Sequence, residues 1–213
     1  MTFKRLIFPL VLCLLPVLVS AQQANTPEAS LKGSVEQLQS LIEQHRAQYK
    51  ANPQSFYKVV NEVAVPHFDV RYIAQIVMGR YWREATPAQR QAFAENFKDM
   101  MIRSYANGLL ENASTTKVEW KPSRYQAGDK TATVRTVMAR DDGQNIPIDF
   151  AMRLVDGHWK VYDIVIDNIS LVLNFRTQIT TDMQQNGIDA VITKLKRQQL
   201  SAPPGVPQAG AKR

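Results

Sequence analysis

The hydrophobic and polar positions divide the chain into a helical half, a strand-rich segment and a helical end. Up to residue 112, apolar side chains recur every three or four positions, which is the spacing of an amphipathic helix. Between residues 116 and 166 they recur every second position, as in a strand with one buried face. Helical spacing returns after residue 170. This pattern predicts an α+β fold in which helices cover the apolar face of a sheet.

Capping residues followed by proline mark the expected starts of three helices. These pairs are Thr26-Pro27, Asn52-Pro53 and Thr86-Pro87. The third pair opens the longest helix, which is expected to reach about Leu110. Asp69 is expected to cap a short helix that ends at Gly79, and residues 80–83 are expected to form a loop.

Four strands are expected in the middle of the chain, over residues 116–124, 131–140, 146–155 and 158–166. Short turns join them, at Gly128-Asp129, Asp141-Asp142-Gly143 and Asp156-Gly157. Strands joined by such short turns form an antiparallel meander, so we expect a curved four-stranded sheet.

The last strand, residues 158–166, carries large apolar groups on both faces. Alternation places Trp159, Val161, Asp163 and Val165 on one face, and His158, Lys160, Tyr162, Ile164 and Ile166 on the other. Ser170 then caps the first of two C-terminal helices, expected over residues 171–185 and 188–200. A two-faced strand that runs directly into a helix forms the wall and corner of a cavity, which we expect to carry the function.

The termini are predicted to lie outside the folded unit. Lys4 and Arg5, the 14 apolar residues 6–19 and a small residue at Ala21 are typical of a cleaved signal peptide over residues 1–21. An uncleaved anchor is the alternative, but it needs roughly 20 apolar residues. Residues 22–200 are expected to form one domain, and the proline-containing stretch 201–213 is expected to be a disordered tail.

Composition excludes several kinds of chemistry. The single cysteine, Cys13, lies in the leader, so the mature chain has no thiol and no disulfide. The leader holds two of the 26 basic residues and none of the 19 acidic ones, which leaves the mature chain at +5. This charge favours a mild attraction to anionic surfaces. The basic residues are dispersed and match no nucleic-acid-binding module, so nucleic acid is not an expected partner.

Candidate catalytic and metal-binding residues are few. His45, His67 and His158 have no metal-ligand spacing with another His, Cys or carboxylate, so we expect no metal and no other cofactor. Asp163 lies in the middle of a strand, where burial would raise its pKa unless a partner compensates. Two interpretations fit such a carboxylate: an ion pair with Arg135, Arg153 or Arg176, or a general base in a cavity. We favour the ion pair and expect no catalytic residue.

Two groups of residues carry a resemblance to a known family. The first is Gly79-Arg80-Tyr81-Trp82 with Thr86-Pro87, Phe93, Phe97 and Tyr105. The second is Trp159-Lys160-Val161-Tyr162-Asp163, Ser170-Leu171-Val172, Asn174-Phe175-Arg176, Gly187 and Leu195. The chain resembles the MlaC-type periplasmic phospholipid-binding carriers, also called toluene-tolerance proteins, over nearly the whole mature sequence. It departs from the family at Asn168, where Gly is usual, and at Phe175, where Tyr is frequent.

The resemblance implies a sheet and several helices around an apolar pocket for phospholipid acyl chains. It implies a monomeric carrier that shuttles lipid between an outer-membrane lipoprotein–porin complex and an inner-membrane ABC transporter with an MCE-domain subunit. This activity would maintain the lipid asymmetry of the outer membrane. A non-catalytic adaptor with a solid core, or an enzyme with Asp163 as base, is the alternative.

Methionine and aromatic residues are frequent on the inward faces of the predicted elements. Such side chains adapt to irregular apolar ligands, although they also fill ordinary cores. The expected pocket residues are Phe56, Val60, Ile76, Tyr81, Phe93, Phe97, Met101, Tyr105, Val134, Met138, Ile148, Phe150, Met152, Tyr162, Ile164 and Val172.

Overall fold

A computed structural model describes residues 26–112, 116–126, 128–140 and 145–200 of the 213-residue chain. The expected signal peptide, the expected tail and the turn at residues 141–143 lie outside these ranges. Within the described ranges, the structure combines helices with an antiparallel sheet, which confirms the α+β prediction. No helix in the described part of the chain has both the length and the apolar character that a membrane span requires.

The helices begin and end close to the predicted positions. They are α1 (Pro27–Ala51), α2 (Pro53–Val63), the 3-10 helix η1 (Val65–His67), α3 (Val70–Met78), α4 (Tyr81–Glu84), α5 (Pro87–Asn112), α6 (Leu171–Asn186) and α7 (Ile188–Lys196). Caps fix several starts: Thr26 Oγ1 accepts a hydrogen bond from the Ala29 N–H at 3.1 Å. Thr86 and Gln89 form a reciprocal capping box at the start of α5, with N···O distances of 2.9 and 3.2 Å.

The short helix α4 corrects the expectation of a loop over residues 80–83. One helical turn buries two adjacent aromatic rings, since Tyr81 and Trp82 are only 8% and 9% exposed. Arg90 of α5 holds this turn in place, because its Nε donates to the Trp82 carbonyl at 2.7 Å. Burial of the two rings therefore compensates for the absence of a side-chain cap at the start of this turn.

The sheet has the strand order β1-β2-β3-β4-β5, and all neighbouring pairs are antiparallel. Its strands are β1 (Thr116–Arg124), β2 (Thr131–Arg140), β3 (Asn145–Val155), β4 (His158–Ile166) and β5 (Ile169–Ser170). The two-residue β5 is one strand more than predicted. It exists because Asp167 and Asn168 both adopt positive φ, 49° and 63°, and so reverse the chain in a two-residue turn.

A β-bulge in β4 corrects the predicted alternation of this strand. The pairing register with β3 shifts between Ala151 and Met152, which leaves an extra residue near Tyr162. Trp159 and Val161 are buried before the bulge, and Ile164 and Ile166 occupy the inner face after it. The extra residue moves the later side chains to the face opposite the predicted one.

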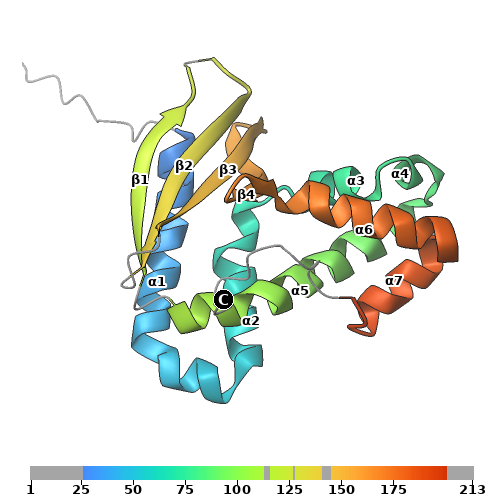
Figure 1. Ribbon diagram of the computed structural model, residues 1–213, viewed down its shortest axis with the longest axis horizontal. Coiled ribbons are helices and arrows are strands. Elements are labelled where there is room, and N and C mark those ends of the chain that lie inside the picture. Colours follow the sequence, from blue (N-terminus) through green and yellow to red (C-terminus); the bar gives the residue numbers. More distant parts are fainter. Residues whose placement is uncertain (1–25, 113–115, 127, 141–144, 201–213) are drawn as a thin grey trace, which may run out of the picture.

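The helices and the sheet form two groups of elements, one around the sheet and one around α6 and α7 (Figure 1). In Figure 1, α1 lies behind the sheet, while α3, α4, α6 and α7 gather at the other end and α5 runs between the two groups. A continuous buried core joins α3 to α7, with side chains such as Met78, Phe93, Phe97, Phe175 and Ile179 at 2% exposure or less. Smaller cores lie between α1, α2 and α5 and between α1 and the sheet.

Candidate functional site

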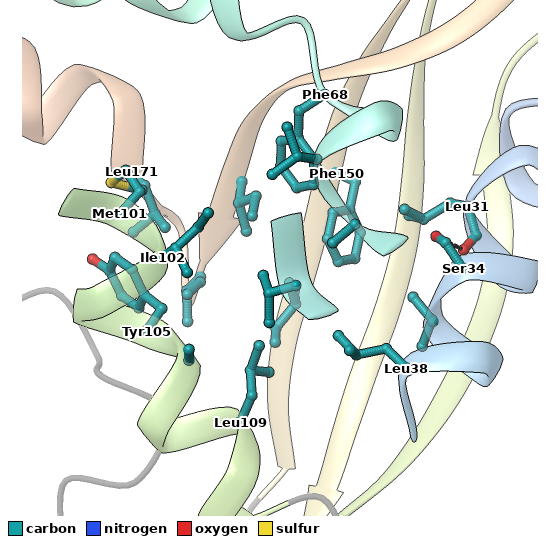
Figure 2. Close-up of a pocket in the computed structure, with 18 of the residues that line it drawn as sticks. Leu31, Ser34, Leu38, Phe68, Met101, Ile102, Tyr105, Leu109, Phe150 and Leu171 are labelled. Atoms are coloured by element: carbon teal, nitrogen blue, oxygen red, sulfur yellow. Dashed lines mark hydrogen bonds between the residues drawn. The ribbon is translucent and has the colours of Figure 1, made fainter. Parts of the chain in front are cut away.

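An apolar cavity of about 350 Å³ lies between the concave face of the sheet and the helices α1, α2, α3, α5 and α6, and it is partly open to solvent. Figure 2 shows side chains from opposite walls: Leu31 and Leu38 from α1, Met101 and Tyr105 from α5, and Phe150 from the sheet. A volume of this size is at the lower end of the range for small-molecule sites. The cavity is therefore large enough to be a ligand site.

Helical periodicity explains why α5 forms one wall. Met101, Tyr105 and Leu109 recur at intervals of four residues, and Ile102 lies beside them, so one stripe of the helix faces the cavity. Strand periodicity does the same for the sheet, where Thr136 and Ile148 are register partners on the inner face. The two periods place apolar side chains on opposite sides of one space.

Polar groups in the wall are mostly satisfied by the protein itself. Ser34 Oγ donates to the Leu31 carbonyl at 2.8 Å, and Thr136 Oγ1 donates to the Ile148 carbonyl at 2.8 Å. The Tyr105 hydroxyl is buried and has no hydrogen-bond partner among the described residues. Burial raises the pKa of Tyr105 to about 12, so this side chain is neutral. The wall therefore presents few unsatisfied polar groups to an apolar ligand.

Asp163 lies within β4, beside the start of α6, and it lines the cavity. Its Oδ2 accepts a hydrogen bond from Ser170 Oγ at 2.5 Å, and its Oδ1 accepts one from the Val172 N–H at 3.1 Å. Burial raises the pKa of the carboxyl group, while these hydrogen bonds lower it and only partly compensate. The carboxylate thus ties β4 to the first turn of α6.

The prediction that Asp163 forms an ion pair with Arg153 is wrong. The Arg153 guanidinium lies instead 3.1 Å from Asp69 Oδ2 and 4.2 Å from the centre of the Tyr72 ring. For the described residues, the ion pairs include none between Asp163 and Arg135 or Arg176. The N-terminus of α6 supplies hydrogen-bond donors that an arginine would otherwise have supplied.

Nine of the sixteen residues expected to form a pocket line this cavity. They are Val60, Phe97, Met101, Tyr105, Met138, Ile148, Phe150, Ile164 and Val172. They come from α2, α5, the sheet and α6, so elements distant in sequence meet at one space. The other seven lie outside the wall.

Four of these seven residues pack in solid helical cores. Phe56 is 0% exposed and packs against the tilted ring of Tyr49, with ring centroids 5.2 Å apart, between α1 and α2. Ile76, Tyr81 and Phe93 belong to the core around α3, α4 and α5. Their side chains face neighbouring helices because α6 and α7 cover this end of the molecule and leave no space there.

The remaining three residues belong to the sheet but lie beyond the cavity. Val134 and Met152 are 0% exposed and pack in one core with Leu31 of α1 and Trp159 of β4, where the helix rests directly on the sheet. Tyr162 occupies the bulge, and its ring contacts Tyr72 of α3 edge-to-face at 5.7 Å. The close contact of α1 with the sheet and the adjacent bulge lie at the same end of the cavity and limit it there along the strands.

The prediction missed the contribution of α1 and of the α2–α3 connection. The wall includes Leu31, Ser34, Val35, Leu38, Gln39 and Ile42 of α1, and Ala64, Val65, Phe68, Val70 and Ile73 beyond α2. It also includes Val118 and Trp120 of β1. The apolar stripe of α1 is visible in the sequence as an amphipathic pattern, but the pattern does not show whether a stripe covers a cavity or a filled core.

The described residues contain no group of three or more His, Cys, Asp or Glu side chains that would hold a metal ion. His67 lies beside α1, where burial and the nearby charge of Lys160 lower its pKa. His45 lies near the Tyr49 ring, with centroids 5.8 Å apart. Neither histidine lines the cavity.

Comparisons with known proteins identify relatives of this chain. The family model described as MlaC protein matches residues 32–197. Toluene tolerance protein Ttg2D of Pseudomonas putida is 32% identical over 180 residues, which cover 84% of this chain and 82% of that protein. The intermembrane phospholipid transport system binding protein MlaC of Haemophilus influenzae is 24% identical over 176 residues, which cover 81% of this chain and 82% of that protein.

A solved structure has the same fold. It is the phospholipid-binding protein from Ralstonia solanacearum in complex with a phospholipid, with a TM-score of 0.74 and 30% sequence identity. The match covers 80% of this chain and 95% of that chain. Because the family model spans most of the sequence and these relatives agree with it, the chain belongs to the MlaC family.

Proposed function

We propose that this protein is a periplasmic phospholipid carrier. It would shuttle lipid between an outer-membrane lipoprotein–porin complex and an inner-membrane ABC transporter with an MCE-domain subunit, and so maintain outer-membrane lipid asymmetry. The observation that carries the proposal is the apolar cavity between the sheet and α5. The leader-like residues 1–21 support export, and the phospholipid-bound relative supports the class of cargo.

In this proposal the acyl chains occupy the cavity, and phospholipid is cargo rather than a cofactor. Burial of a methylene group contributes about 0.8 kcal/mol, so an acyl chain of ordinary length gains roughly 10 kcal/mol relative to water. A bilayer offers nearly the same gain. A carrier therefore needs only to match the membrane, and delivery depends on a small difference in affinity between the carrier and its partner.

The mechanism requires no catalytic group. The protein works as a monomer that shields the chains from water during diffusion, while the head group remains near the protein surface. The carboxylate oxygens of Asp163 already accept hydrogen bonds from Ser170 and Val172, which gives this residue a structural task.

Native mass spectrometry of the purified mature protein, followed by solvent extraction of the ligand, tests this function. We expect a mass excess that corresponds to intact phospholipid. A folded protein without ligand that also fails to take lipid from vesicles would contradict the proposal and favour an adaptor. Release of a chemically altered ligand that Asp163→Asn abolishes would instead favour an enzyme.

A further inference from the structure

Lys98 is one of two charged residues in a mostly apolar wall. It lies on the stripe of α5 that faces the cavity, three, four and seven residues before Met101, Ile102 and Tyr105. Among the described wall residues, only Lys98 and Asp163 carry a formal charge. The Asp163 carboxylate is bound to the start of α6, whereas Lys98 pairs with two exposed carboxylates, so Lys98 is the wall charge whose partners lie at the surface.

The Lys98 side chain runs from the cavity to the protein surface. Lys98 lines the cavity and its side chain is 17% exposed, whereas its partners Glu95 and Asp99 are 60% and 51% exposed. The ammonium Nζ lies 2.9 Å from Glu95 Oε2 and 3.3 Å from Asp99 Oδ1. At this point the cavity wall is therefore connected to the surface by ion pairs whose carboxylates are exposed.

The lysine is charged in this position. Burial by itself lowers the pKa of Lys98, but the hydrogen bonds and charges of Glu95 and Asp99 outweigh it, and the pKa lies above its ordinary value. A lysine stem that covers apolar surface while its ammonium reaches solvent is common in proteins. Here the arrangement also places one cation between two accessible anions at the edge of a candidate lipid site.

This charge pattern is complementary to one class of head group. A phosphoethanolamine or phosphocholine group carries an anionic phosphodiester and a cationic nitrogen a short distance apart. With the acyl chains in the cavity, the phosphodiester would face the Lys98 ammonium and the cationic nitrogen would face Glu95 or Asp99. A phosphoglycerol head group carries only the negative charge of its phosphodiester. It would meet the cluster of Glu95, Lys98 and Asp99, whose net charge is −1.

We propose that Glu95, Lys98 and Asp99 form a docking site for the head group of zwitterionic phospholipids, so that the protein selects them over anionic ones. The proposal rests on the phospholipid-carrier function and adds a head-group preference to it. Exposed ion pairs of this kind are individually weak, so the expected preference is about fivefold.

The test is a competition between two lipids. Protein is equilibrated with vesicles of equimolar phosphatidylethanolamine and phosphatidylglycerol with identical acyl chains, and the bound lipids are extracted and quantified by mass spectrometry. We expect the wild type to hold about five times more phosphatidylethanolamine than phosphatidylglycerol. In Glu95→Gln/Asp99→Asn the preference disappears or reverses, because Lys98 then presents an unopposed positive charge.

A matched control has the same change in net charge away from the cavity. Glu36→Gln/Glu62→Gln removes two carboxylates from exposed ion pairs on α1 and α2, with N···O distances of 4.0 and 3.8 Å. This variant is expected to keep the wild-type ratio. An equal shift in the control, or a wild-type ratio equal to that of the vesicles, would overturn the proposal.

A second variant tests the lysine itself. Lys98→Met keeps an apolar stem in the wall but removes the partner of the phosphodiester, so total bound lipid is expected to fall about fivefold at limiting vesicle concentration. Unchanged lipid retention by Lys98→Met would also overturn the proposal. A wild-type protein that binds neither lipid contradicts the carrier function instead, which distinguishes the two failures.

Discussion

At the scale of single residues, Asp163 shows how a side chain can be identified correctly and its partner missed. Its position in the middle of a strand indicates a buried carboxylate, which needs a partner to offset the cost of burying its charge. The compensating groups are Ser170 Oγ and the Val172 N–H, both on the segment that follows β4. The sequence marks Ser170 as a helix start, but it does not show that the chain reverses at Asp167 and Asn168 and brings this helix start to Asp163.

We predict that Asp163→Asn makes the free energy of unfolding less dependent on pH. The folded-state pKa of Asp163 lies above its ordinary value of 3.8, so the folded protein binds this proton more tightly than the unfolded chain does. The resulting stabilisation is fully present below about pH 3.8 and is lost as pH rises through the raised folded-state pKa. Relative to Asp163→Asn, the wild type should lose stability across that interval. Urea unfolding of both proteins at a series of pH values measures the difference.

The matched variant Asp163→Ala separates the charge from the hydrogen bonds. It leaves the Val172 N–H and the Ser170 hydroxyl without their acceptor, so we expect a loss of about 2 kcal/mol at neutral pH. Asn retains an acceptor oxygen and should lose less. A parallel pH dependence in wild type and Asp163→Asn would show that the carboxyl group titrates normally.

At the scale of elements, the strands show that inward orientation alone does not define a cavity wall. Val134 and Phe150 are register partners on neighbouring strands, yet only Phe150 lines the cavity. Val134 is 0% exposed beneath the first turns of α1. A charge introduced at these two adjacent positions should therefore have different consequences.

We predict that Phe150→Asp abolishes lipid retention while the protein still folds, because the new carboxylate lies in a wall that water can reach. Val134→Glu should instead lower the free energy of unfolding by roughly 4 kcal/mol, because its charge is buried without a partner. Thr133→Glu, on the outer face of β2, should change neither property. Lipid extraction and urea unfolding measure the two effects, and lipid retained by folded Phe150→Asp would show that the wall is assigned incorrectly.

The element boundaries were largely predictable, because each depends on local chemistry. Thr26, Asn52 and Thr86, each followed by proline, mark helix starts, although Asn52 makes no side-chain capping bond. Period-two patterns mark β1 to β4. Two features were not predictable: the bulge at Tyr162, which reverses the side-chain alternation, and α4, which forms to bury Tyr81 and Trp82. Both depend on contacts with segments distant in sequence, which a local pattern does not contain.

At the scale of the whole molecule, the question is why one part is solid and another hollow. The side chains of α3 to α7 interlock around Phe93, Phe97 and Phe175, with ring centroids 5.6 and 5.2 Å apart. Between α1, α5 and the sheet, apolar side chains of similar type line a space instead. The two regions have similar side chains. Whether a region is filled or hollow therefore depends on the distance between the helices and the sheet, and the complete fold sets that distance.

A hollow apolar region makes stability depend on its contents. A ligand that binds only the folded state raises the free energy of unfolding, by about 2.7 kcal/mol at a concentration one hundred times its Kd. We therefore predict that removal of bound lipid lowers the thermal unfolding midpoint of the wild type and that added phospholipid vesicles restore it. Differential scanning calorimetry before and after delipidation measures the change.

Phe150→Asp provides the control for this prediction, because a variant that holds no lipid has none to lose. Its unfolding midpoint should be the same before and after the delipidation step, and vesicles should not raise it. The unfolding midpoint of the wild type could also stay the same after verified loss of lipid. In that case the empty cavity would have to collapse at no cost in free energy. The layers around the cavity would then be mobile, and the distance between α1 and the sheet would be set by the cargo rather than by the fold.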